Sequence, residues 1–148
     1  SVTGVQTCAL PIYSVKAAEP DLSQLKRLRI LVAEDDEINQ MLMVENLRNV
    51  VHEVVVADNG NIAVEKVRAE KFDLIFMDQL MPEMGGLEAT AKIRQNEARM
   101  GEARIPIIAL SGNAMPEDVA DALAAGCDAH LAKPVRKEQI IETLLRYT

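Results

Sequence analysis

Aromatic residues are scarce in this chain. Tryptophan is absent, and phenylalanine and tyrosine together make up 3% of the 148 residues. The length is that of one domain with a tail, and 49% of the residues are hydrophobic, so one real core can be built. That core must be packed from Val, Ile, Leu, Met and Ala, which suits helices layered on a sheet.

Positive charge, long apolar runs and cysteine are also limited. The formal net charge is -7 and no stripe of Lys and Arg is present, so we expect no direct contact with nucleic acid. No stretch reaches the roughly 18 to 20 apolar residues of a membrane span, and we expect no membrane contact by this segment. The two cysteines, Cys8 and Cys127, match neither a disulfide framework nor a zinc site. These features fit a cytoplasmic location, and a parent protein could still be anchored in a membrane.

The first residues differ in character from the rest. Val2–Ile12 resembles the translation of a sequencing-adapter oligonucleotide more than any domain, and it would be a poor export signal because no basic residue precedes it. The polar segment Tyr13–Lys26 is typical of a linker. We therefore expect residues 1–26 to be disordered and residues 27–148 to form the domain.

Five short apolar runs recur along that domain. They predict strands at Leu28–Ala33, Val54–Ala57, Phe72–Met77, Ile105–Leu110 and Ala129–Ala132. Between them, apolar residues recur at helical spacing, as at Ile140 and Leu144. This alternation predicts an α/β fold, a doubly wound (βα)5 parallel five-stranded sheet with helices on both faces. The charged segment Gln95–Arg104 is predicted to be a frayed helix end and a loop.

Polar groups follow four of the predicted strands. These strand ends carry Glu34–Glu37, Asp78, Ser111-Gly112 and Lys133-Pro134. The carboxyl ends of parallel strands share one edge of a sheet, where the chemistry of such folds collects. We therefore expect these side chains to lie close together.

Carboxylates gathered at that edge would repel one another unless a cation lies among them. Mg²⁺ prefers oxygen ligands and commonly binds through one or two carboxylates and a phosphate. Asp78 could attack phosphorus and form an acyl phosphate, while Lys133 and Ser111 neutralise the phosphoryl oxygens. Gly112 has no side chain, so its backbone N–H could approach a phosphate oxygen closely.

Each residue also has a simpler explanation when it is taken alone. Lys133 could be a surface lysine, Ser111 a helix N-cap and Asp78 a turn residue. Glu34–Glu37 could be a solvated first turn favoured by the helix dipole. Only their combination, in the right order at the right strand ends, favours a phosphoryl site.

From Arg29 to Tyr147 the chain resembles the receiver domains of two-component response regulators, whose fold is flavodoxin-like. The motifs that carry the resemblance are Ile30–Asp35, Met77-Asp78, Met81-Pro82, Gly86, Ala109–Gly112 and Lys133-Pro134. Three further stretches are similar to the receivers of hybrid sensor histidine kinases: Glu34–Gln40, Gly86–Thr90 and Gly126–Leu131.

The resemblance implies a role for each site residue. Asp78 would be the phosphoacceptor. The implied Mg²⁺ ligands are Asp35 and Asp78 directly, Glu34 through water and Leu80 through its backbone carbonyl. The implied phosphoryl contacts are Lys133, Ser111, Gly112 and Gln79. The implied switch residues are Ser111 and His130, and the Lys133-Pro134 bond is expected to be cis.

Three positions depart from the family pattern. Glu34 replaces the commoner aspartate and Gly112 the usual alanine, and neither change alters the chemistry. His130 replaces the family's Tyr or Phe, and an imidazole can hydrogen-bond or take a proton where a phenyl ring cannot. His130 is therefore either a modified switch residue or simply a half-buried strand histidine.

The resemblance implies a phosphorylation switch rather than an enzyme, and any histidine kinase activity would belong to a parent region. Its expected partner is a histidine kinase or a histidine phosphotransfer domain, and a phosphorylation-dependent dimer stays open. The main alternative is a degenerate receiver that only binds proteins. A phosphatase of the haloacid dehalogenase type would need a second acid two residues after Asp78, where Leu80 stands.

Overall fold

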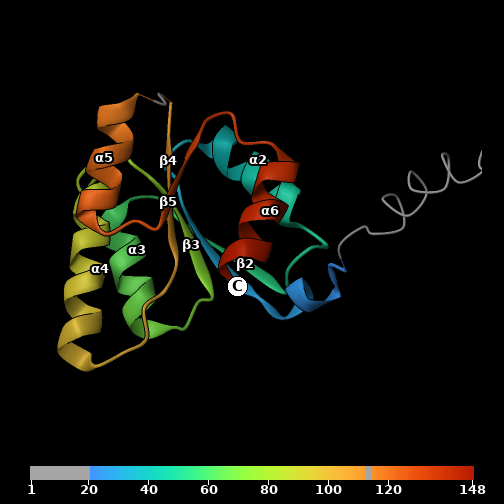
Figure 1. Cartoon of the computed structure of the whole chain (residues 1–148), viewed down its shortest axis with the longest axis horizontal. Helices are drawn as coiled ribbons and strands as arrows, with labels where there is room; N and C mark the ends of the chain where they lie inside the picture. The colour runs from blue at the N-terminus through green and yellow to red at the C-terminus, as the bar shows by residue number, and fades with distance from the viewer. Residues whose placement is uncertain (1–20, 113–114) are drawn as a thin grey trace, which may run out of the picture.

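A computed structural model describes residues 21–112 and 115–148, and within them a five-stranded parallel sheet forms the centre of the molecule (Figure 1). The strands are β1 Arg29–Ala33, β2 Glu53–Ala57, β3 Leu74–Asp78, β4 Ile107–Ser111 and β5 Ala129–Ala132. Their order is β2-β1-β3-β4-β5 and all four pairings are parallel. This order confirms the predicted doubly wound, flavodoxin-like fold.

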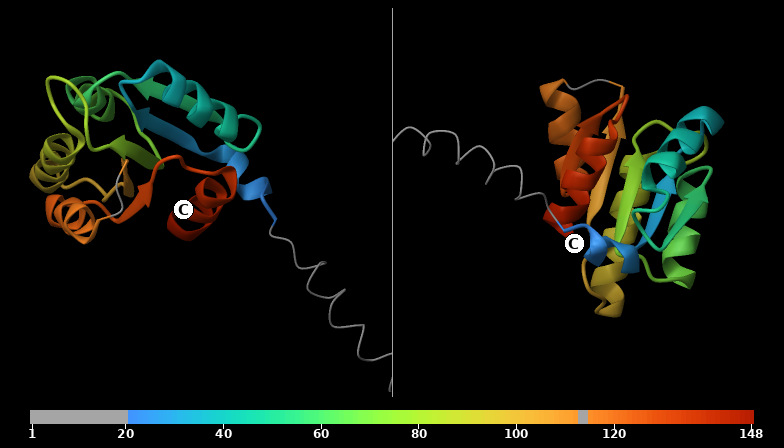
Figure 2. Two further views of the ribbon diagram at one scale, coloured as in Figure 1. Left: turned by 90° about the horizontal axis from the view of Figure 1, so that it is seen from above. Right: turned by 90° about the vertical axis from the view of Figure 1, so that its right-hand side faces the viewer.

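Helices cover both faces of the sheet. They are α2 Glu37–Leu47, α3 Gly60–Ala69, α4 Gly86–Met100, α5 Pro116–Ala125 and α6 Lys137–Tyr147. Figures 1 and 2 show α3, α4 and α5 on one side of the sheet and α2 and α6 on the other. Each side has its own core, and every residue of β3 and β4 is buried. Burial on both faces explains why these strands are apolar without alternation.

Local sequence signals set several helix ends. The Asp36 side chain accepts hydrogen bonds from the backbone N–H groups of Ile38 and Asn39, which caps α2. Pro116 occupies the first turn of α5, and Gly126 ends that helix with a φ of 115°. The peptide bond between Lys133 and Pro134 is cis, as expected.

The prediction of a frayed end for Gln95–Arg104 was partly wrong, because α4 continues through Met100. The last turns of α4 are held by Arg94, whose guanidinium lies 2.8 Å from a Glu97 carboxylate oxygen and 2.9 Å from an Asp128 one. A segment rich in charge therefore stays helical because its charges pair within the tertiary structure. The loop prediction holds only after Gly101.

Packing also begins before the expected boundary at residue 27. A 3₁₀ helix, η1, spans Ser23–Arg27, and Leu25 is buried in the core beneath α2 and α6. Two leucines, Leu22 and Leu25, are too few in a polar segment to give a clear periodic signal, so the burial of Leu25 could not be predicted. Of the disordered tail expected over residues 1–26, residues 1–20 lie outside the described residues.

No helix in the described part of the chain is both long and apolar enough to cross a membrane.

Candidate functional site

Four strand ends meet at one edge of the sheet. Asp78 and Ser111 are the last residues of β3 and β4, one position later than the predicted strand ends, while Glu34 and Lys133 follow β1 and β5 directly. The backbone N–H of Lys133 donates to the carbonyl of Ser111 at 2.7 Å, which fixes the end of β5 against β4. The sheet thus brings together side chains that are as far as about a hundred residues apart in sequence.

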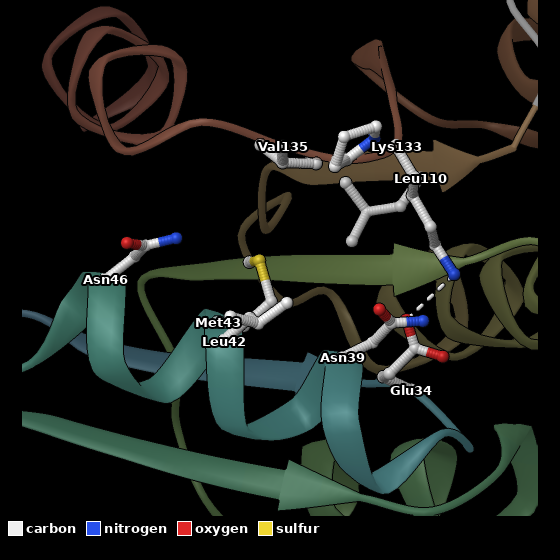
Figure 3. A pocket seen from close by; sticks show the side chains of 9 residues that line it. Glu34, Asn39, Leu42, Met43, Asn46, Leu110, Lys133 and Val135 are labelled. Atoms are coloured by element: carbon white, nitrogen blue, oxygen red, sulfur yellow. Dashed lines mark ion pairs between the residues drawn. The ribbon is translucent and has the colours of Figure 1, made fainter.

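Lys133 bridges the two buried carboxylates of the site. Its Nζ lies 2.9 Å from Oδ2 of Asp78 and 2.8 Å from Oε1 of Glu34. Figure 3 shows the lysine reaching from the β5–α6 loop across to Glu34, beside a cleft that side chains of α2 line. Glu34 is 1% exposed and Asp78 is 3% exposed, so both carboxylates lie away from bulk water.

Burial and neighbouring charges shift the pKa values of Glu34 and Lys133. Burial raises the pKa of Glu34, and its proximity to Asp78 raises that pKa further, although Lys133 opposes both effects. Burial alone would lower the pKa of Lys133, but its close contacts with the Glu34 and Asp78 carboxylates outweigh burial, so that the pKa is raised. The ammonium is thus held in its charged form between the two acids.

The acidic residues could also hold a metal ion. Glu34, Asp35 and Asp78 each offer a carboxylate oxygen, and these oxygens lie within 4.8 Å of one another. Oε1 of Glu34 is buried without a hydrogen-bond partner among the described residues, because its close approach to Lys133 is an ion pair without hydrogen-bond geometry. Three carboxylates against one ammonium leave negative charge that a hard divalent cation such as Mg²⁺ fits.

Three other predicted residues lie around this cluster. The Leu80 side chain is 79% exposed, and its backbone N–H donates to Oδ1 of Asp78 at 3.3 Å. The backbone N–H of Gln79 donates to the carbonyl of Leu110, and its side-chain amide donates to the backbone carbonyl of Asp118. To contact a phosphate, Gln79 would have to use its second amide hydrogen or give up one of these bonds. No atom lies within 4 Å of the place of a Cβ on Gly112, so no described neighbour requires glycine there.

The two predicted switch residues contact each other. Oγ of Ser111 lies 2.7 Å from Nε2 of His130, and Ser111 is buried while His130 is half-buried. Sequence patterns singled out both residues but not this bond, because it joins neighbouring strands and replaces the hydrophobic packing expected of an aromatic ring.

Sequence reasoning named Gly86 only as part of the family motif and missed its role in shaping the site. A Cβ on Gly86 would lie 2.1 Å from the backbone oxygen of Asp78, so α4 can start this close to the end of β3 only with glycine. The Gly85-Gly86 pair in the sequence is the signal that could have indicated this close approach.

Comparison with known proteins places this geometry in a family. The profile of the response regulator receiver domain matches residues 30–145. Sensor protein GacS of Pseudomonas syringae pv. syringae is 37% identical over 120 residues, which are 81% of this chain but 13% of GacS. The chain therefore spans only a small part of that relative.

Two solved structures show the same fold. The receiver domain of Ssk1 from Saccharomyces cerevisiae, crystallised with the histidine phosphotransfer protein Ypd1, superposes with a TM-score of 0.78 at 30% identity, covering 83% of this chain and 90% of that one. The receiver of the sensor histidine kinase PA1611 from Pseudomonas aeruginosa has a TM-score of 0.73 at 34% identity, covering 82% and 97%. That structure has a magnesium ion coordinated in its active-site cleft.

The match covers most of the domain, the sheet order is that of a flavodoxin-like fold, and the acidic cluster lies at the strand ends. The chain belongs to the response regulator receiver domain family of two-component signalling.

Proposed function

We propose that Asp78 is the phosphoacceptor of a two-component phosphorelay and takes a phosphoryl group from a phosphohistidine on a partner protein. The observation that carries this proposal is the placement of Asp78, which is buried at the end of β3, within 2.9 Å of Lys133 and clustered with two further carboxylates. The histidine kinase and receiver relatives support the same reading.

In the proposed reaction, an Asp78 carboxylate oxygen attacks phosphorus and forms the P–O bond of an acyl phosphate. The P–N bond to the donor imidazole breaks, and its electron pair remains on that nitrogen. Lys133 exchanges part of its contact with Asp78 for a phosphoryl oxygen, and Ser111, Gly112 and Gln79 supply further donors. These donors neutralise charge that develops on the phosphoryl oxygens.

Mg²⁺ is the proposed cofactor, held by Asp35, Asp78, the Leu80 carbonyl and, through water, Glu34. When bound, it would neutralise the acidic cluster and the incoming phosphate. The buried Oε1 of Glu34, which accepts no hydrogen bond among the described residues, and the magnesium in the PA1611 receiver support this assignment.

The proposed partner is a histidine kinase or a histidine phosphotransfer domain. A phosphohistidine must be brought against Asp78, so the partner has to cover the rim of the site. Large apolar side chains on α2 and directly after β3 are mostly exposed, with Ile38 at 69%, Met41 at 70%, Leu42 at 55% and Leu80 at 79%, and could contact such a partner. The Ssk1 receiver, which was crystallised with a phosphotransfer protein, supports a partner of this class.

Phosphorylation would then switch a protein-interaction surface. Ser111 and His130 link the site to β5, and α5 and α6 flank that strand in sequence. We propose that the surface of α5, β5 and α6 repacks when the phosphoryl group binds. We propose that this switch operates in the cytoplasm and that a phosphorylation-dependent dimer is one form of its output.

The test is phosphorylation of the purified chain by phosphoramidate, a small donor with a P–N bond, followed by intact mass measurement. With Mg²⁺ we expect one phosphoryl group per chain, with EDTA almost none, and with Asp78→Asn none. Asp121→Asn, a change on the exposed surface of α5, is the matched control and should label as the parent chain does. Equal labelling of Asp78→Asn would defeat the assignment, and no labelling of the parent chain would favour a receiver that only binds proteins.

A further inference from the structure

The bond between Ser111 and His130 links the phosphoryl site to the edge strand. His130 pairs with Ala109 in the sheet and Ser111 pairs with Ala132, so the two side chains lie diagonally across β4 and β5. Ala129 and Leu131 pack into the core beneath α2 and α6, which puts His130 on the opposite face, with Ala109. From there the imidazole reaches Oγ of Ser111 at 2.7 Å.

The chemistry of the two groups limits how this bond can be made. A hydroxyl has one hydrogen to donate, and Nε2 of a neutral imidazole either donates or accepts according to the tautomer. Two directions are therefore open between Ser111 and His130. Phosphoryl oxygens on Asp78 would only accept, so a serine that donates to them has used its single hydrogen. Its bond to His130 then survives in one direction only, from Nε2–H to Oγ.

We propose that His130 is a positioning residue that donates its Nε2–H to Ser111 in the phosphorylated protein and so aims the serine hydroxyl at the phosphoryl group. This inference rests on the proposed function of Asp78. Phosphorylation thereby favours the form of His130 that carries a hydrogen on Nε2. The phosphorylation state of Asp78 thus affects which ring nitrogen of this β5 residue is protonated. A phenyl ring at this position could not supply that donor.

The first test observes the ring nitrogens directly. The chain has two histidines, and His52 is exposed on the surface, so it serves as an internal reference. ¹⁵N NMR of both rings is measured with Mg²⁺, before and after adding beryllofluoride, which mimics a phosphoryl group on a carboxylate. We expect Nε2 of His130 to be protonated in the beryllofluoride complex, and an unprotonated Nε2 there would overturn the inference. If beryllofluoride did not shift the backbone amide signals around Asp78 in the same sample, the proposed function itself would fail. That outcome is separate from an unprotonated Nε2.

The second test compares variants of the donor. His130→Phe removes the N–H and should weaken beryllofluoride binding about tenfold, the effect of one hydrogen bond in a charged network. His130→Gln keeps a side-chain N–H and should restore most of that loss. In a Ser111→Ala background, His130→Phe should have little further effect, because the two residues act through one bond. Unchanged affinity in His130→Phe, or fully additive losses, would contradict the positioning role.

Discussion

Glu34 is the most buried of the three carboxylates at the strand ends, at 1% exposure. Its charge is disfavoured by burial and by Asp78 and is favoured by Lys133, and the raised pKa shows that the unfavourable effects are larger. A buried acid held in this way destabilises the fold unless a cation relieves it. Glu34 should therefore lower the stability of the metal-free protein.

The first prediction concerns stability without metal. Because the folded protein holds the Glu34 proton more tightly than the unfolded chain does, the free energy of unfolding should fall as pH rises from the ordinary carboxylate value through the raised pKa. In EDTA at pH 7, Glu34→Gln should therefore unfold at a higher temperature than the parent chain. Its Mg²⁺ affinity should be lower by roughly tenfold or more, as for other outer ligands of metal sites.

Thermal unfolding followed by circular dichroism and a Mg²⁺ titration would measure both effects. Glu37→Gln, on the exposed first turn of α2, is the matched control and should leave Mg²⁺ binding unchanged. A Glu34→Gln protein less stable than the parent chain in EDTA at pH 7 would show that its ion pair with Lys133 outweighs its burial.

At the scale of elements, the site depends on how closely α4 begins against the end of β3. Gly86 opens α4, and its backbone N–H donates to the carbonyl of Gln79 at 3.0 Å. A side chain there would collide with the backbone of Asp78, which has no freedom to move because β3 is buried on both faces. The position of the Asp78 carboxylate is thus partly set by the start of α4.

We expect Gly86→Ala to lower the free energy of unfolding by about 2 to 3 kcal/mol, as overpacking in a rigid interior does. It should also shift the backbone amide signals around Asp78. Gly112→Ala meets open space and should change stability by less than about 0.5 kcal/mol. Urea unfolding of the two variants provides the comparison, and equal stabilities would mean that α4 can retreat from β3 without cost.

The end of α4 depends on a buried ion-pair network. Arg94 donates to the carbonyls of Gly126 and Ile105 as well as to Glu97 and Asp128, so one side chain connects α4 to the loops before β4 and β5. The Arg94 and Glu97 side chains are only 13% and 9% exposed. Charges with so little access to water need their partners.

Arg94→Ala should cost about 3 kcal/mol of unfolding free energy, because it leaves the Glu97 and Asp128 carboxylates without their shared partner. The matched control is Arg48→Ala, which breaks an exposed pair with Glu45 that is 63% and 66% exposed and should cost less than about 0.5 kcal/mol. Urea unfolding at low salt would measure the two costs. Similar small losses in both variants would show that water replaces Arg94.

At the scale of the whole molecule, two separate cores hold the sheet in place, and η1 belongs to one of them. Figures 1 and 2 show η1 close to the C-terminal end of α6, so the start and the end of the described domain meet at the edge opposite the site. Leu25 is 1% exposed and packs within the core that contains Leu28 and Leu144. η1 is therefore part of the folded unit.

Leu25→Ala should lower the free energy of unfolding by about 3 kcal/mol, the usual cost of a cavity left by a buried leucine. Leu123→Ala, at a position on α5 that is 52% exposed, is the control and should cost less than about 1 kcal/mol. Both are measured by urea unfolding. A near-neutral Leu25→Ala would restore the expected boundary at residue 27, because η1 would then contribute little to the domain.

Much of the fold could be predicted because its signals are local. The run before Asp78 is apolar without alternation, and this pattern is a direct consequence of burial on both faces of a strand. The order of such runs and the helices between them then restricts the sheet to a few arrangements. The same reasoning predicted that Asp78, Ser111 and Lys133 would share one edge, since parallel strands end on the same side.

What could not be predicted depends on partners far apart in sequence. The helical state of residues 95–100 depends on Arg94 meeting Asp128, and the burial of Leu25 depends on a core built by α2 and α6. A local sequence pattern does not show that these distant residues come into contact. The bond between Ser111 and His130 likewise requires a strand register that the sequence leaves open.

The sequence by itself determined which segments become strands and which residues stand at their ends, because hydrophobic periodicity and turn chemistry act over a few residues. Only the tertiary structure decided which of these groups touch: Lys133 between Glu34 and Asp78, Gly86 against the Asp78 backbone, and His130 on Ser111. The physical reason is that ion pairs, steric exclusion and hydrogen bonds depend on separations of a few ångströms, which exist only after the sheet has brought the distant strand ends together.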